Sequence, residues 1–152
     1  MNTTHAPVRL GLQINEIDSE YSKALVEGLR DLCASEKISL IVFSGRAYGW
    51  PFGFEYQNTA IFSHISPASC DALVVASGTQ CNFITREEFF QTFSHRSDLP
   101  RVSMSVVLTD TPSIVIDNET GFRAVIEHIL EVHGCKRVAV LCGPQDNPDS
   151  VN

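Results

Sequence analysis

Short apolar segments alternate with helical patterns along almost the whole chain, and this alternation limits the folds that are open to it. The apolar segments are rich in Val, Ile and Leu and fall at residues 8–14, 38–43, 71–76, 101–107, 113–116 and 137–142. Continuous apolar runs of this length are typical of strands that are buried on both faces. Separated by helices, such strands predict an α/β fold in which a parallel sheet is flanked by helices.

The first three helical segments are predicted from different combinations of cap residues and apolar spacing. The first should be capped by Asp18 or Ser19 and should bury a face made of Ile17, Tyr21, Leu25, Leu29, Leu32 and Cys33. A weaker helix is expected at residues 55–66, with an inner face of Tyr56, Ala60, Ile61 and Ile65. Residues 85–93 open with a capping box from Thr85 to Glu88, and the phenylalanines that follow (Phe89, Phe90 and Phe93) are predicted to belong to the core.

A last helix is predicted after the strand at residues 113–116. Asn118 can cap it, and Gly134 can end it because glycine readily adopts the conformation of a helix stop. Its inner face would consist of Phe122, Val125, Ile126, Ile129 and Leu130.

The composition is that of one globular domain. The chain has 152 residues, of which 43% are apolar and 19% are charged, and its net charge is −7 at pH 7. Basic residues do not cluster, so we expect no direct contact with nucleic acid. No segment approaches the roughly 20 apolar residues that span a bilayer, and residues 1–7, expected to be disordered, lack the apolar part of a signal peptide. These features predict a cytoplasmic protein that does not contact membranes.

Cysteine and histidine spacing gives no metal site. The five cysteines form no CxxC pair and are predicted to be buried, reduced thiols rather than a disulfide framework or metal ligands. His64, His128 and His133 fall on predicted helices without a partner four residues away. The phosphate-binding patterns GxGxxG and GxxxxGK[ST] and the nucleophile pattern GxSxG are absent. We therefore expect neither a cofactor nor an enzyme.

Polar residues follow the strands at the edge where a parallel sheet binds its ligands. They are Asn15, Glu16, Asp18, Ser44, Gly45, Arg46, Ser77, Gly78, Thr79, Gln80, Asn82, Ser105, Asp117 and Asn118, with the aromatic Tyr48, Trp50 and Phe52 among them. Amides, hydroxyls and flat aromatic faces suit a hydroxylated small molecule such as a sugar or a nucleoside. Residues of these types are also common in turns, so for any one of them alone turn formation is favoured over ligand contact.

The segment LPRVSMS and the later PSIVIDNETGFRAVIEHILEVHGCKRVAVLCGPQDNP carry a more specific pattern. Its marks are Asp117-Asn118, Gly121, His128-Ile129, His133-Gly134, Lys136-Arg137 and Gly143-Pro144. This pattern resembles the ligand-sensing domain of the lactose-repressor and galactose-repressor (LacI/GalR) family, which has the periplasmic-binding-protein type I fold. The start of the chain, RLGLQINEIDSEYSKALVEGLRDLC, is similar to the first strand and helix of that family.

The resemblance implies a receptor whose two lobes close on an effector. On this template residues 8–117 form the first lobe and residues 118–152 the incomplete start of the second. The effector would be a small molecule, most of all a sugar, and the full-length protein would be a homodimer. The ligand contacts carried over by position are Asn15, Glu16, Ile17, Ser77, Gly78, Thr79, Ser105 and the hinge residue Asp117. Many family members have an acid at the position of Ser105.

The chain also departs from a typical repressor, because it begins almost directly at the first strand, without the DNA-binding helix-turn-helix of about 60 residues. Sensors of that kind are similar to input modules of signalling proteins with a diguanylate cyclase or histidine kinase output. The segments SGRAYGWPFGFEYQ and SGTQCN look particularly like that branch. The alternative is a module for protein interaction, in which the helix at 55–66 and its aromatic loop mediate dimerisation and no ligand is bound.

Overall fold

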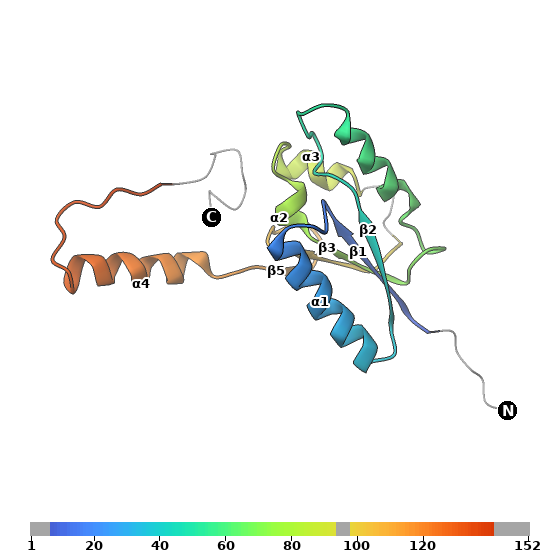
Figure 1. The fold of residues 1–152 in the computed structure, drawn as a ribbon, viewed down its shortest axis with the longest axis horizontal. Helices are drawn as coiled ribbons and strands as arrows, with labels where there is room; N and C mark the ends of the chain where they lie inside the picture. The colour runs from blue at the N-terminus through green and yellow to red at the C-terminus, as the bar shows by residue number, and fades with distance from the viewer. Residues whose placement is uncertain (1–6, 94–97, 142–152) are drawn as a thin grey trace.

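A five-stranded parallel sheet forms the centre of the protein, as the sequence predicts (Figure 1). The structure is a computed structural model that describes residues 7–93 and 98–141. The strands are β1 (Arg9–Ile14), β2 (Ser39–Ser44), β3 (Ala72–Val75), β4 (Arg101–Met104) and β5 (Ser113–Ile114). Their order across the sheet is β2-β1-β3-β4-β5, so β1 and β3 lie side by side and β2 and β5 form the edges. The fold class is therefore α/β.

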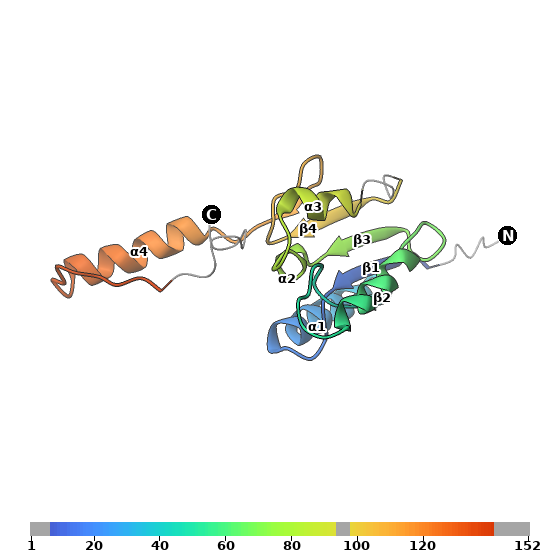
Figure 2. The ribbon, with the colours of Figure 1, turned by 90° about the horizontal axis from the view of Figure 1, so that it is seen from above.

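Helices cover both faces of this sheet. They are α1 (Glu20–Ser35), the 3₁₀ helix η1 (Glu55–His64), α2 (Ser77–Gln80), α3 (Arg86–Gln91) and α4 (Asn118–Glu131). Side chains of α1 pack on one face, whereas η1 and α3 pack on the other. Figure 2 shows that α4 extends away from these layers. The short helix α2, which the sequence did not predict, lies directly after β3.

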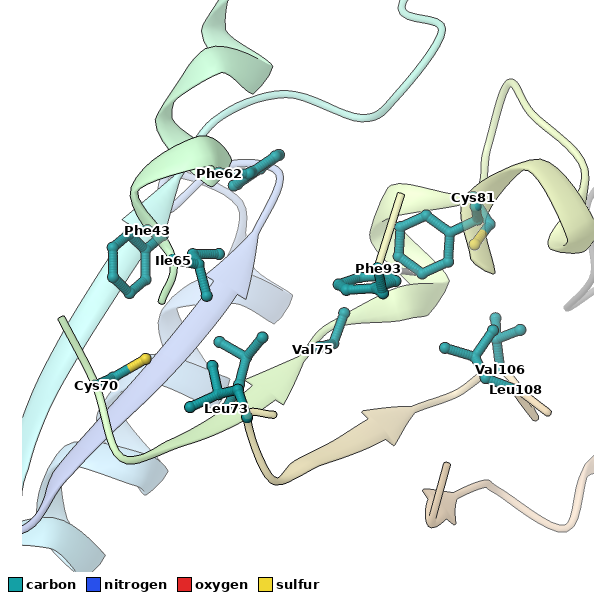
Figure 3. Close-up of a cluster of buried hydrophobic side chains, with 12 residues drawn as sticks. Phe43, Phe62, Ile65, Cys70, Leu73, Val75, Cys81, Phe93, Val106 and Leu108 are labelled. Carbon is teal, nitrogen blue, oxygen red and sulfur yellow. The ribbon is translucent and has the colours of Figure 1, made fainter. Parts of the chain in front are cut away.

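The larger core fills the face under η1 and α3. Figure 3 shows it running from Phe43 and Phe62, on β2 and η1, to Val106 and Leu108 beyond β4. Phe89 and Phe93 are buried in it with their ring centroids 4.9 Å apart, as the sequence predicts for this aromatic group. This cluster contains most of the large buried side chains and therefore dominates the stability of the fold.

Helix α1 begins where the sequence predicts and buries part of the predicted face. The Ser19 hydroxyl accepts a hydrogen bond from the Ser22 amide and caps the helix. The predicted inner residues Tyr21 and Leu32 are 49% and 55% exposed. The predicted residues Leu25 and Leu29 do pack on the sheet, together with Val26, and Cys33 is buried as predicted. A 16-residue helix with apolar residues around much of its circumference leaves several faces possible, and contact with the sheet selects one.

Two further sequence predictions about burial are only partly correct. The four central residues of strand β2 are apolar, but the strand lies at the edge of the sheet, so Phe43 is buried whereas Leu40 and Val42 are half-buried. The helix predicted at 55–66 is a 3₁₀ helix anchored by Phe62; of the predicted inner residues, Ile65 is buried but Tyr56 and Ile61 are exposed. Hydroxyls in η1 donate to carbonyls three residues earlier, which favours the tighter helix.

The C-terminal segment departs most from the sequence prediction. Asp117, rather than Asn118, caps α4, and the predicted inner residues Phe122, Val125 and Leu130 are exposed. The strand predicted at 137–142 is not formed over residues 137–141, and Cys142 lies outside the described residues. A strand needs a neighbour for its backbone N–H and C=O groups, and within the described residues no strand lies beside this segment.

The cysteines agree with the prediction in part. Cys33, Cys70 and Cys81 are buried, reduced thiols, but Cys135 is exposed. Among the described residues no helix is long and apolar enough to span a membrane.

Arg9 and Asp71 tie the amino ends of β1 and β3 together. The Asp71 carboxylate accepts a hydrogen bond of 2.8 Å from Nη2 of Arg9 and one of 2.7 Å from its backbone N–H. The Arg9 guanidinium, followed by the Arg9 backbone amide, lowers the pKa of Asp71 below its usual value. A carboxylate with a lowered pKa in the folded state contributes stability above its unfolded-state pKa of about 3.9, and this is lost as the pH falls through the folded-state pKa.

We therefore expect Asp71→Asn to lower stability at neutral pH and to make the loss of stability below about pH 4 less steep. Urea unfolding measured between pH 3 and pH 7 tests this. Asp31→Asn, on the exposed surface of α1, is the matched control and should leave the profile unchanged. Parallel pH profiles for Asp71→Asn and the unmodified chain would contradict the prediction.

Candidate functional site

The parallel topology brings the carboxyl ends of the strands to one edge of the sheet. Because β1 lies between β2 and β3, the segment after β1 is flanked by the segments that follow both neighbours. Asn15 and Glu16 follow β1, the loop 45–54 follows β2, and α2 follows β3. Ligands of open α/β sheets bind at this edge, which makes these residues the candidate site.

The loop 45–54 crosses the end of β1 and packs against the segment after β3. The Tyr48 amide donates a hydrogen bond of 3.3 Å to the carbonyl of Gln80 at the end of α2. Gly49 has a φ of +71°, and a Cβ there would lie 2.9 Å from the carbonyl oxygen of Phe83. The rings of Trp50 and Phe83 meet edge to face with their centroids 5.3 Å apart. The loop and residues 80–84 together therefore form a cover over the end of β1.

Buried polar atoms without partners gather beneath and within this cover. In the part of the chain that the structure describes, they are the amide N and O of Gln13 and Gln80, Oδ1 of Asn15 and Nε1 of Trp50. Gln13 and Gln80 are 0% exposed. Buried polar groups are normally paired, and each one left unpaired costs about 1–3 kcal/mol. All of these atoms belong to one edge of the sheet, which marks it as a place with unused hydrogen-bonding capacity.

Arg46 joins three segments at this edge. Its Nη1 lies 3.1 Å from Oε2 of Glu16, and its Nε lies 2.6 Å from Oε2 of Glu55. Its guanidinium carbon lies 5.3 Å from the centroid of the Trp50 ring, within the range of a cation–π contact. One cation thus meets two carboxylates and one aromatic ring. The arrangement fixes the loop 45–54 relative to β1 and leaves this cluster with a net negative charge.

The residues predicted after β3 form a second polar group. Ser77 is buried, and its hydroxyl lies 2.7 Å from that of Ser103 on β4, which donates to the carbonyl of Val106. The Thr79 hydroxyl donates to the carbonyl of Ala76, and Gly78 beside it is half-buried. Ser77 is therefore committed to a structural hydrogen bond, whereas Gly78 and Thr79 face the edge with part of their surface exposed.

Ser105 and Asp117 lie farther along the sheet. Ser105 has a φ of +73°, a left-handed conformation that is uncommon outside glycine, and its amide donates to the carbonyl of Ile114. Strained backbone of this kind is frequent at functional sites. Asp117 is exposed and caps α4 by accepting from the Thr120 amide, which lowers the pKa of its carboxyl group.

The structure brings some of the predicted residues together and leaves others apart. Glu16 contacts the loop 45–54 through its ion pair with Arg46, and Asn15 lies beside it at the end of β1. Ile17, by contrast, is 46% exposed. The sequence did not indicate Gln13 as a site residue, because a single polar residue within an apolar strand carries no recognisable signal of function. Gln80, Arg46 and Trp50 were recognised as edge residues, but only the fold shows that they converge.

The side chains at this edge are of the types that hold a ligand by hydrogen bonds and ring contacts. It offers amide, hydroxyl and indole groups, carboxylates and aromatic faces, and its guanidinium is already paired. Within residues 7–93 and 98–141, no group of three or more His, Cys, Asp or Glu side chains is placed to hold a metal ion.

Comparison with known proteins identifies the fold. The sequence matches no protein-family model and no curated protein. The structure is similar to the lac repressor dimer bound to operator and the anti-inducer ONPF, with a TM-score of 0.72 and 14% identity over 97% of this chain and 42% of that one. It is also similar to the transcriptional repressor AscG of Escherichia coli, with a TM-score of 0.66 and 20% identity over 95% of this chain and 49% of that one.

A third similar structure is a sugar-binding transcriptional regulator of the LacI family from Escherichia coli, complexed with phosphate. Its TM-score is 0.64 and its identity 22%, over 94% of this chain and 49% of that one. The chain thus has the fold of LacI-family regulators and spans less than half the length of each of these structures.

Proposed function

We propose that this chain is the effector-sensing domain of a LacI/GalR-type regulator or related signalling protein and binds a sugar or nucleoside-like molecule at the carboxyl edge of its sheet. The observation that carries the proposal is the set of unpartnered polar atoms of Gln13, Asn15, Trp50 and Gln80. These atoms include both donors and acceptors. A hydroxyl group can donate and accept, so a polyhydroxylated ligand matches them better than an apolar one.

The charges at the edge favour an uncharged effector. Arg46 already meets Glu16 and Glu55, and no basic residue is among the candidate contacts. The half-buried Asn15 and Trp50 would make the first contacts, and Trp50 also offers a flat ring on which a sugar can stack. Gln13 and Gln80 lie deeper and would be reached when the loop 45–54 shifts.

The solved structures support the regulatory part of the proposal. One is described as a sugar-binding transcriptional regulator, and another as a repressor dimer holding an anti-inducer. By this comparison we propose that residues 8–117 form a first lobe and that residues 118–152 begin a second one. The output of the whole protein, whether DNA binding, a diguanylate cyclase or a histidine kinase, and its place in the cytoplasm belong to the same proposal.

Thermal unfolding in the presence of neutral sugars and nucleosides tests this function. A ligand at 100 times its Kd should add about 2.7 kcal/mol to the free energy of unfolding, which is readily seen as a rise in Tm. The phosphate ester of each sugar serves as the charged comparison and should produce a smaller shift. If no compound in the panel raises Tm, the proposal fails.

We expect Trp50→Ala to weaken binding of the active compound at least tenfold, because it removes both the stacking face and the indole N–H, a loss of about 1.4 kcal/mol or more. Trp50→Phe keeps an aromatic face and should lose less. Phe54→Ala, at a ring that is 78% exposed, is the matched control. Equal affinity in Trp50→Ala and Phe54→Ala would show that the ligand does not bind at this edge.

Self-association is a second candidate, favoured by the aromatic surface near the loop 45–54. Phe52, Phe54 and Tyr56 are 64%, 78% and 47% exposed, and they lie within five residues of one another in the chain, before and at the start of η1. Exposed apolar groups of this kind often mark protein contacts. Analytical ultracentrifugation should show a dimer that Phe54→Ala weakens. A monomer at high micromolar concentration would exclude this candidate.

A further inference from the structure

The end of α4 brings two imidazole rings together. His128 lies in the last turn of the helix, His133 follows it, and their Nε2 atoms are 3.2 Å apart. The ring centroids are 4.9 Å apart, and the ring planes are nearly perpendicular at 81°. Both side chains are exposed. Their spacing of five residues is outside the helical pattern for metal ligands, so the sequence did not indicate this pair.

The backbone at the end of the helix creates the pair. The Val132 amide still donates to the carbonyl of His128, but the chain then turns at Gly134, which has a φ of +63°. The Cys135 amide donates to the carbonyl of Ile129, which holds the turn against the last helical residues. The glycine permits this reversal, because a left-handed conformation carries little steric cost without a Cβ. His133 is thereby folded back beside His128.

The spacing of the two nitrogens matches that of two ligands on one metal ion. Zn–N bonds are about 2.0–2.1 Å long, so two nitrogens 3.2 Å apart would subtend an angle of about 100° at the ion, close to a tetrahedral angle. Rings that both direct Nε2 at such an ion would have centroids about 5 Å apart, which agrees with the observed 4.9 Å. The same pair can also share one N–H···N hydrogen bond, in which a proton occupies the place of the ion.

We propose that His128 and His133 bind a divalent transition-metal ion of the Zn²⁺, Ni²⁺ or Cu²⁺ type through their Nε2 atoms. Imidazole nitrogen is a preferred ligand of these ions, and the partial negative charge at a helix C-terminus favours a cation there. Among the described residues no third side chain completes the set, so the ion keeps coordination positions for water or an outside ligand. Bound in this way, the ion cross-links the last turn of α4 to the turn that follows it.

Isothermal titration of the whole chain with Zn²⁺ tests the site. We expect one equivalent to bind and His128→Gln and His133→Gln each to weaken the affinity at least tenfold. His64→Gln, an exposed histidine at the end of η1, is the matched control and should stay within twofold. Glutamine preserves helix propensity, and α4 does not pack on the sheet, so these variants should keep the fold, which circular dichroism can verify.

Two further measurements distinguish Zn²⁺ bound by His128 and His133 from Zn²⁺ bound elsewhere on the chain. The imidazole ¹⁵N resonances of His128 and His133 should shift together on addition of Zn²⁺ and not of Mg²⁺, and amides at the end of α4 should exchange more slowly. Zn²⁺ binding that survives both substitutions would show an adventitious ion only and would overturn the proposal. Absence of Zn²⁺ binding would overturn it as well. Neither result would affect the proposed sugar site, which lies on other elements.

Discussion

Replacing Phe62 by alanine should lower the free energy of unfolding by about 3–5 kcal/mol, which is enough to unfold many domains of this size. Phe62 is 0% exposed and is the anchor through which η1 packs on the sheet. The ring centroids of Phe62 and Tyr48 are 5.5 Å apart, so Phe62 also supports the loop 45–54. The substitution would remove buried surface and leave a cavity that the neighbouring rings cannot fill.

Urea unfolding measures this effect, and Phe54→Ala provides the control in the same segment of the chain. Phe54 directly precedes η1 but is 78% exposed, so its removal should change stability by less than about 0.5 kcal/mol. Similar losses for both substitutions would mean that η1 is not held in the way the structure describes. If Phe62→Ala remains folded, it should also bind effector less tightly, because Tyr48 and the loop lose their support.

Gly45→Ala and Gly28→Ala should change stability in opposite directions. A Cβ at Gly45 would lie 2.6 Å from Cζ of Phe62 and 2.9 Å from the backbone oxygen of Asn58. The ring is enclosed by the core and the carbonyl belongs to η1, so neither can move cheaply. Overpacking of this kind costs about 1–3 kcal/mol.

Gly28 lies within α1, where a Cβ would meet nothing within 4 Å. Alanine there should raise the free energy of unfolding by about 0.5–1 kcal/mol, because glycine is the poorer helix former. Chemical denaturation of the two variants beside the unmodified chain measures both changes. A loss of stability in Gly28→Ala, or none in Gly45→Ala, would contradict the packing at these positions.

Local chemistry made much of the fold predictable. Five of the six predicted strands formed at the apolar runs, and side-chain caps placed the start of α1 at Asp18 or Ser19, of which the structure uses Ser19, and the start of α3 at Thr85. Each of these signals depends on residues within a few positions of one another, so the sequence reveals them directly. The same holds for the strand-end edge as the place to look for a ligand, because parallel strands all end there.

Contacts between distant segments were not predictable in this way. An apolar run looks the same whether its strand becomes central, like β3, or an edge, like β2. The position of α2, which ends at Gln80, beside Gln13 depends on the pairing of β1 with β3, and the pairing of His128 with His133 depends on a single turn at Gly134.

The sequence by itself thus determined the α/β class, the approximate strands and the caps of α1 and α3, because spacing and propensity act over a few residues. Only the tertiary structure decided which apolar faces are covered and which polar atoms lack partners. Leu12 and Gln13 are neighbours in one strand and both 0% exposed, yet one is satisfied by packing beneath α1 and the other keeps an unpaired amide. Burial depends on what the rest of the chain places on top of a residue, and that is a property of the folded molecule.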